Sequence, residues 1–335
     1  MTPIVYAAPY TPPAPPPNPW RGIGMRWESP DGSVWSLTGP RAAGVRMRPG
    51  VRGLTEPPRE QYIDETAGVE GGRYRGSRAV VREVFWPISV WKDTDTVGWL
   101  EYDSAWWRSL DPDVPGRWVV THPDGTERHL LCRFADDGDP GWESAPGMRA
   151  WARYGVRMIA VDPYWRGATI TRSWSGAVTE GETFVGAGGP PFTISEGSTL
   201  ATAEVTNPGD ITTHLQWWVS DVDGADLSVG DRTIEVPAVA ADRMLVIDSD
   251  PTELSAIEIP VPPATSPVTG EPMSEVERDA WVATHVLTGT DRTTELGDGT
   301  TWGSIPRRST TALGIVMAGT GTVAVRFVPR YRRAW

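Results

Sequence analysis

The feature that most constrains the fold is a repeated pattern of short alternating runs in the C-terminal half of the chain. From residue 166 onward, runs in which apolar and polar residues alternate follow one another, separated by Gly, Pro, Asp and Asn. Alternation predicts strands with one buried face, because successive side chains of a strand point to opposite faces of a sheet. Short strands about 8–12 residues apart are typical of a β-sandwich. We therefore predict a β-sandwich for this half.

The last residues, "VAVRFVPRYRRAW", carry the same alternation. With a period of two, one face holds the apolar residues Val323, Val325, Phe327, Tyr331 and Trp335. The other face holds Arg326, Arg330 and Arg332, and Arg333 breaks the pattern. A strand with one buried face is predicted here, and we expect it to close the second-half sandwich.

The first half also predicts strands, and it adds one helix. The stretches "MRWESPDGSVWSL" and "GRWVVTHPDGTERHLLCRF" predict hairpins that turn at Pro-Asp-Gly. Between them, "SRAVVREVFWPISVW" predicts a long strand, and "MRAWARYGVRMIAVDPYW" predicts a later one. The stretch "GWLEYDSAWWRSL" predicts a helix, because its apolar residues have helical spacing: Leu100, Trp106, Trp107 and Leu110. Asp111-Pro112 ends that helix.

These patterns divide the chain into three parts. Residues 1–19 are proline-rich and predict a flexible arm. Residues 20–165 form a first β-rich domain, and residues 166–335 form the sandwich. A helical insertion is expected near 273–287, where Ser274 and Glu277 have the spacing of a capping box. The predicted fold class is all-β with one or two short helices.

The composition restricts the possible partners. The 335 residues carry a formal net charge of -12, which argues against a nucleic-acid-binding protein. No run of apolar residues is long enough for a membrane span or a signal peptide, so synthesis in the cytoplasm is expected. The single cysteine, Cys132, excludes an internal disulfide, and its apolar surroundings predict a buried side chain.

The chain lacks the common motifs of catalysis and of metal or cofactor binding. Its four histidines form no HxxxH pair, and no GxSxG motif is present. The runs "GAGGPP" and "GTGTVAV" do not complete a phosphate-binding motif, and "DDGDPG" and "DVDGAD" do not complete a calcium loop. We therefore predict no catalytic, cofactor or metal residues and no enzymatic activity. Of the pair Trp217-Trp218, one is expected in the core and the other at a subunit contact.

Several segments, in their order along the chain, resemble the distal tail proteins of phages. "SAWWRSLDP" and "GRWVVTHPDGTERHLLCRF" resemble the first domain of that family, and "AVDPYWRG" resembles the junction that follows it. "VTNPGDITTHLQWWVSD", "VGDRTIEVP", "MLVIDSDP" and "VPRYRRAW" are similar to its second domain. The family is also described as siphovirus tail components or minor tail proteins. The arginine-rich composition is consistent with phages of actinobacteria.

This resemblance implies a fold and a structural role. It implies a split-barrel-like domain that forms a ring, followed by a galectin-like β-sandwich. The expected function is that of a homohexameric adaptor at the virion tail tip, which joins the tail tube to the hub or baseplate and carries adsorption proteins. The tail tube protein, the tail-tip hub protein and other minor tail proteins are the expected partners. The residues expected at interfaces are Trp106, Trp107, Arg330, Arg332 and Trp335.

Two alternatives stay open. The protein would be a carbohydrate-binding tail adhesin if aromatic side chains of the second domain stack on host cell-surface glycans. It would be a cell-wall hydrolase of the tail tip if two carboxylates converge or a set of metal ligands comes together.

Overall fold

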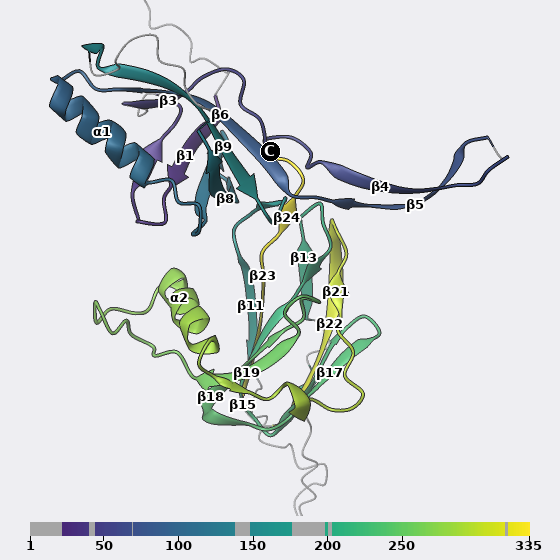
Figure 1. Ribbon diagram of the computed structural model, residues 1–335. Coiled ribbons are helices and arrows are strands. Elements are labelled where there is room, and N and C mark those ends of the chain that lie inside the picture. Colours follow the sequence, from purple (N-terminus) through teal and green to yellow (C-terminus); the bar gives the residue numbers. More distant parts are fainter. Residues whose placement is uncertain are drawn as a thin grey trace, which may run out of the picture.

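The protein is described by a computed structural model that covers residues 22–39, 44–68, 70–137, 148–175, 198–199, 203–318 and 321–335. The proline-rich segment 1–19, the run "GAGGPP" and most of "DDGDPG" lie outside the described residues. Figure 1 shows two β-rich bodies, one above the other, with a long hairpin that projects from the upper one. Within the described residues, no helix is long and apolar enough to cross a membrane.

The upper body is built on a nine-stranded antiparallel sheet with the main order β2-β1-β7-β8-β9-β6-β3. The strands of this main path are β1 (Gly24–Glu28), β2 (Val34–Ser36), β3 (Val45–Met47), β6 (Arg82–Trp91), β7 (Gly116–Thr121), β8 (Glu127–Asp136) and β9 (Trp151–Ala160). Both predicted hairpins are confirmed, since β1 pairs with β2 and β7 pairs with β8. The predicted long strands correspond to β6 and β9, which pair along their whole length.

Tryptophan side chains fill the core of this sheet. Trp86 has edge contacts with Trp27 and Trp118, with ring centroids 5.4 and 5.3 Å apart. Trp118 in turn lies 5.0 Å from Trp165. Such pairs add to the stabilisation that comes from the buried area itself. Cys132 is buried in the same core, as predicted.

The predicted helix is α1 (Thr96–Arg108), and Asp95 caps its first turn by accepting a hydrogen bond from the Gly98 amide. Trp99 and Trp106 point into the core. Leu100, which the helical spacing placed on the apolar face, is exposed instead. Trp99 occupies the buried position that the sequence pattern assigned to Leu100.

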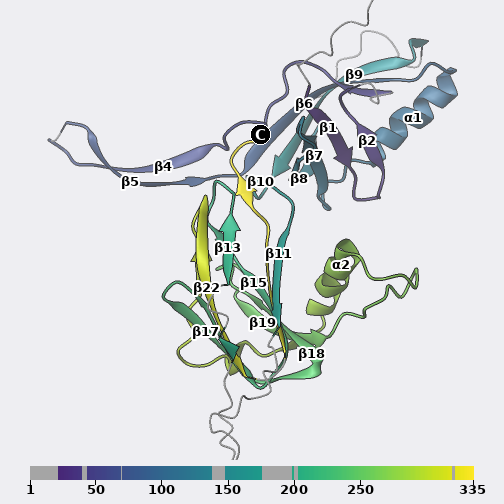
Figure 2. The same ribbon diagram turned by 180° about the vertical axis from the view of Figure 1, so that it is seen from behind.

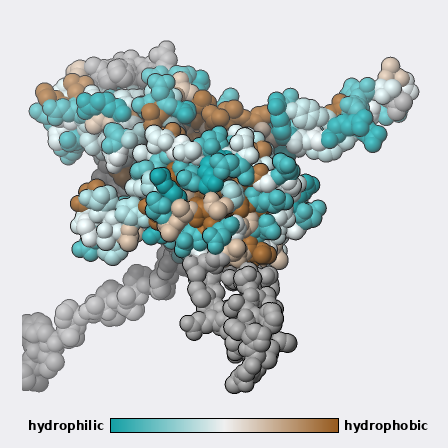
Figure 3. Space-filling model, turned by 90° about the horizontal axis from the view of Figure 1, so that it is seen from below, coloured by the Kyte–Doolittle hydropathy of each residue, from teal (hydrophilic) through white to brown (hydrophobic). Residues whose placement is uncertain are grey.

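A two-stranded hairpin, residues 59–79, extends away from the upper body, and we call it the hairpin arm (Figures 1 and 2). It consists of β4 (Arg59–Glu65) and β5 (Gly72–Ala79), which pair with each other and with no other described strand. Every residue of β4 is exposed. Ion pairs tie the two strands together, with Arg75 2.5 Å from Asp64 and Arg78 2.8 Å from Glu60. Figure 3 shows the arm extending beyond the rest of the molecule.

The lower body is a sandwich of two sheets, with orders β11-β23-β15-β18-β19-β20 and β12-β22-β16-β17, the latter extended by β13 beside β22. Their strands are β11 (Ile170–Ser175), β12 (Ser198–Thr199), β13 (Glu204–Asn207), β15 (Gln216–Val222), β16 (Gly224–Val229), β17 (Arg232–Val236), β18 (Val239–Asp248), β19 (Ser255–Pro260), β20 (Thr290–Asp291), β22 (Ser309–Ala318) and β23 (Thr322–Phe327). Apolar residues of both sheets form one core. The all-β fold class with two short helices is thereby confirmed.

Smaller elements complete the lower body. A short pair joins β14 (Thr213–His214) to β21 (Ser304–Ile305), and a 3-10 turn, η2, spans Thr293–Glu295. The predicted helical insertion is α2 (Glu275–Val286). Its capping box forms as the sequence indicates, with the Ser274 side chain accepting from the Glu277 amide.

The end of the chain departs from the prediction of one continuous closing strand. Val323, Val325 and Phe327 are buried in the sandwich core, so β23 closes the sandwich as expected. The strand ends at Phe327, however. After Pro329, β24 (Arg330–Tyr331) pairs with β10 (Trp165–Arg166) of the upper sheet. The expectation that Tyr331 and Trp335 share a sandwich face with Val323 is therefore wrong.

Candidate functional site at the chain end

The last residues, 330–335, form a terminal segment that is fixed to the upper body by contacts from several elements. The Ala334 amide donates to the Leu54 carbonyl at 2.9 Å. The Ala334 carbonyl accepts from His122 Nε2 at 2.6 Å. Arg128 donates to the Arg333 carbonyl at 2.9 Å, and its guanidinium lies 3.7 Å from the centre of the Tyr331 ring. The terminal segment is thus an integral part of the upper sheet.

One buried arginine connects the terminal segment to the upper body. Arg82 is only 1% exposed, at the start of β6. Its guanidinium donates to four backbone carbonyls: Gly53 and Thr55 at 2.6 Å, Pro163 at 2.7 Å and Arg332 at 2.9 Å. Burial lowers the pKa of Arg82 to about 10, so the side chain stays charged at neutral pH. The Arg82 guanidinium therefore joins three segments that are distant in the sequence: residues 53–55, the turn at Pro163 and the terminal segment.

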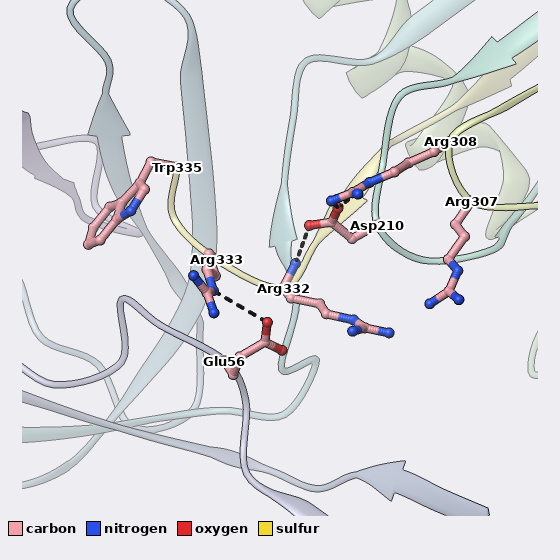
Figure 4. A pocket seen from close by; sticks show the side chains of 7 residues that line it. All are labelled: Glu56, Asp210, Arg307, Arg308, Arg332, Arg333 and Trp335. Atoms are coloured by element: carbon pink, nitrogen blue, oxygen red, sulfur yellow. Dashed lines mark hydrogen bonds and ion pairs between the residues drawn. The ribbon is translucent and has the colours of Figure 1, made fainter.

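Beside the terminal segment lies a pocket of about 560 Å³ between the two bodies (Figure 4). We call it the arginine pocket, and its lining consists of Glu56, Asp210, Arg307, Arg308, Arg332, Arg333 and Trp335. Arg308 donates to Asp210 at 2.5 Å, and Arg333 lies 3.3 Å from Glu56. Burial opposes the ionisation of Asp210, but hydrogen bonds from Arg308 and from the Arg332 amide hold its pKa below the ordinary value.

A buried asparagine connects two turns that carry residues of this pocket. Asn207 is fully buried, and its side-chain oxygen accepts from the Gly209 amide at 2.9 Å. Its side-chain nitrogen donates to the Ile211 carbonyl at 3.0 Å and to the Pro306 carbonyl at 3.2 Å. These bonds connect the turn that carries Asp210 to the turn that carries Arg307 and Arg308. The sequence "N-P-G-D" contained a turn signal, because Asn, Pro, Gly and Asp all favour turns.

Close packing explains the glycine in that turn. A side-chain carbon at Gly209 would lie 2.7 Å from the Arg330 carbonyl oxygen. The turn therefore approaches the backbone of the terminal segment more closely than any larger residue allows. The Asp210 amide uses this proximity and donates to the same Arg330 carbonyl at 2.9 Å.

The structure brings two of the five predicted interface residues together in the arginine pocket, Arg332 and Trp335. Arg330 lies nearby and donates to the Thr212 carbonyl at 3.1 Å. Trp106 is buried in the upper core, and Trp107 packs against Tyr154 with ring centroids 4.9 Å apart. Sequence reasoning missed Glu56, Asp210 and the pair Arg307-Arg308, because they come from loops far apart along the chain. The interface role of the five residues stays a prediction.

Both side chains of the tryptophan pair Trp217-Trp218 are buried within the subunit. Trp217 is in the sandwich core, as expected for one member of the pair. Trp218 is 7% exposed in a second apolar cluster that α2 covers. The Arg326 guanidinium lies 4.6 Å from the Trp218 ring centre and is paired with Asp279 of α2. The expectation of a subunit contact at Trp218 is corrected, because the helix of the same chain occupies that face.

The residues for which the structure gives positions contain no group of three or more His, Cys, Asp or Glu that could hold a metal ion.

A histidine near the junction makes stability depend on pH. His129 on β8 lies opposite Arg166 of β10, and burial together with Arg117 and Arg166 lowers its pKa to about 4. The unfolded chain binds a proton near pH 6.5 while the folded state does not, so stability falls as the pH drops from about 6.5 to about 4. We expect a loss of up to about 3 kcal/mol over this window in urea unfolding experiments.

The matched variant for this prediction is His129→Gln, which keeps a polar side chain and removes the titration. It is expected to flatten the dependence of the unfolding free energy on pH. Part of the dependence will persist, because burial also lowers the pKa of His214. An identical slope in the variant and the parent would contradict the assignment.

The fold described above is similar to that of a phage tail protein of known structure. No family model matches the chain. Over 125 residues the chain is 25% identical to the Minor tail protein Gp27 of Mycobacterium phage L5, a match that covers 36% of this chain and 37% of that protein. The match thus spans little more than a third of the relative's length.

Solved structures give a match over most of the chain. The Dit protein of phage SPP1, described as a paradigm of the hub adsorption apparatus in phages infecting Gram-positive bacteria, superposes with a TM-score of 0.57 at 13% identity. That comparison covers 92% of this chain and 99% of the SPP1 chain. A chain of the phage P2 baseplate gives a TM-score of 0.45 at 9% identity and covers 91% and 98%. The resemblance to phage distal tail and minor tail proteins is confirmed.

Proposed function

We propose that the protein is a structural component of the virion tail tip that forms a homohexameric ring between the tail tube and the hub or baseplate. The observation that carries this proposal is the shared fold with SPP1 Dit, which extends over both bodies of the chain. The local similarity to a mycobacteriophage minor tail protein supports the same role. The partners in this proposal are the tail tube protein, the tail-tip hub protein and other minor tail proteins.

The hairpin arm supports assembly into a ring. A two-stranded hairpin alone is marginally stable in water, because it has no core of its own. The arm nevertheless extends from the body with exposed apolar side chains, among them Ile63 at 50% and Tyr74 at 61% exposure. A neighbouring subunit would cover these side chains and complete the hairpin's packing. An arm that reaches a neighbour in one direction produces a head-to-tail contact, and such contacts form a ring when the rotation between successive subunits closes.

The adhesin alternative receives no support from the tryptophan pair that suggested it, since Trp217 and Trp218 are both buried. We propose instead that adsorption proteins bind to the lower body, as the adaptor role requires.

Native mass spectrometry of the purified full-length protein, with negative-stain images of the same sample, tests the proposal. We expect a hexamer of 36.6 kDa subunits with a central channel. If the protein stays monomeric both alone and when mixed with purified tail tubes, the ring role is refuted.

A further inference from the structure

The arginine pocket carries an excess of positive charge in a protein that is acidic as a whole. Four arginines line it, against the two carboxylates of Glu56 and Asp210. The net charge of the chain is -12, so a local excess of two positive charges departs from the general surface. Arginine clusters of this kind are typical of sites that recognise anions.

The side chains of two of these arginines have no partner within the part of the chain that the structure describes. Arg308 pairs with Asp210, and Arg333 pairs with Glu56. For Arg332, the backbone amide and carbonyl are bonded, but the buried side-chain Nε lacks any hydrogen-bond acceptor among the described residues.

Arg307 is exposed at the other side of the pocket, and its side chain likewise forms no ion pair or hydrogen bond to a described residue. Figure 4 shows the side chains of Arg307 and Arg332 extending away from the paired residues. The two carboxylates of the pocket are paired with Arg308 and Arg333, so the guanidiniums of Arg307 and Arg332 repel each other, and this repulsion favours a bound anion.

The charge excess identifies the class of anion. A phosphate monoester carries about -1.5 to -2 charges at pH 7, which matches two unpaired guanidiniums, whereas a single carboxylate neutralises one. Its oxygens accept paired hydrogen bonds from the planar fork of each arginine. On the rim, the indole of Trp335 is 48% exposed and offers an apolar face to a group attached to the phosphate.

The geometry points to the arginine pocket as a binding site for a phosphate group, held by Arg307 and Arg332 at the junction of the two bodies. The site takes free phosphate or the phosphate ester of a sugar, and it does not depend on the ring role proposed above.

Isothermal titration calorimetry of the full-length protein with inorganic phosphate, glucose 6-phosphate and glucose tests this site. We expect saturable binding of both phosphates in the millimolar range and none of glucose. The double variant Arg307→Gln/Arg332→Gln keeps the backbone contacts of the terminal segment and should weaken phosphate binding by about tenfold or more. The control Arg243→Gln removes an exposed arginine on β18, outside the pocket, and should bind as the parent does.

The same titrations separate the two sources of phosphate. Equal affinities for both compounds assign the site to the free oxyanion. Tighter binding of glucose 6-phosphate that is lost in Trp335→Ala assigns it to a sugar phosphate. The proposal is overturned if neither phosphate binds saturably, if the double variant with unchanged melting temperature binds as the parent does, or if a hexaglutamate peptide binds and phosphate does not.

Discussion

Replacing Arg82 with methionine is expected to lower the free energy of unfolding by about 4 kcal/mol or more. Methionine fills much of the volume but donates no hydrogen bond, so the carbonyls of Thr55, Pro163 and Arg332 lose their buried cationic donor. Each unsatisfied buried acceptor costs about 1–3 kcal/mol. Urea unfolding monitored by tryptophan fluorescence measures the loss, because the core of the upper body contains several tryptophans.

Two further variants make this result specific. Arg82→Lys should fall between the parent and Arg82→Met, because an ammonium keeps the charge but offers three donors in place of five. Arg157→Met removes an arginine from β9 of the same sheet that is 61% exposed and pairs with Asp136, and it should change stability by less than about 1 kcal/mol. The stabilising role of Arg82, which connects the terminal segment to the upper body, is contradicted if Arg82→Met and Arg157→Met unfold at the same urea concentration.

Removing the hairpin arm is expected to abolish ring assembly and leave a folded subunit. In this variant an Asn-Gly turn replaces residues 61–77. The exposed residues of β4 contribute nothing to the upper core, so the far-UV circular dichroism and the melting temperature should stay close to those of the parent. Native mass spectrometry should then detect monomers where the parent gives hexamers. This prediction rests on the proposed ring.

Point variants localise the effect to the arm. Ile63→Asp with Tyr74→Asp places charges on the apolar side chains of the arm and should weaken assembly as the deletion does. Val34→Asp introduces the same change at an exposed apolar residue of β2, away from the arm, and should leave the hexamer intact. A hexamer that survives removal of the arm would show that other surfaces hold the ring.

The sequence predicted the elements of this fold whose signal is local. The Pro-Asp-Gly turns, the capping box at Ser274 and the alternation of Val323, Val325 and Phe327 each appear in the structure where the pattern placed them. The hairpin arm was missed, because most of its residues are polar and its few apolar residues lack the one-sided alternation that marks a half-buried strand.

The candidate site could be predicted only in part. Arg332 and Trp335 were singled out from the final residues, but their surroundings depend on the return of the chain to the upper sheet. In the pocket Glu56 pairs with Arg333, 277 positions away, and Asp210 pairs with Arg308, 98 positions away, and no local pattern reports such contacts. Period-two alternation also continues across Pro329, so it could not indicate that the strand ends at Phe327.

The pairing of β10 with β24 has a mechanical consequence. The lower body is joined to the upper one by two covalent paths, and they run side by side, with Trp165 opposite Tyr331 and Arg166 opposite Arg330. A single tether would let the suspended body swivel about one bond axis. Two adjacent connections resist rotation of the lower body relative to the upper one. A force that pulls on the lower body acts on β10 and β24 together. The protein thus transmits both torque and pull from one body to the other through a short, double-stranded coupling.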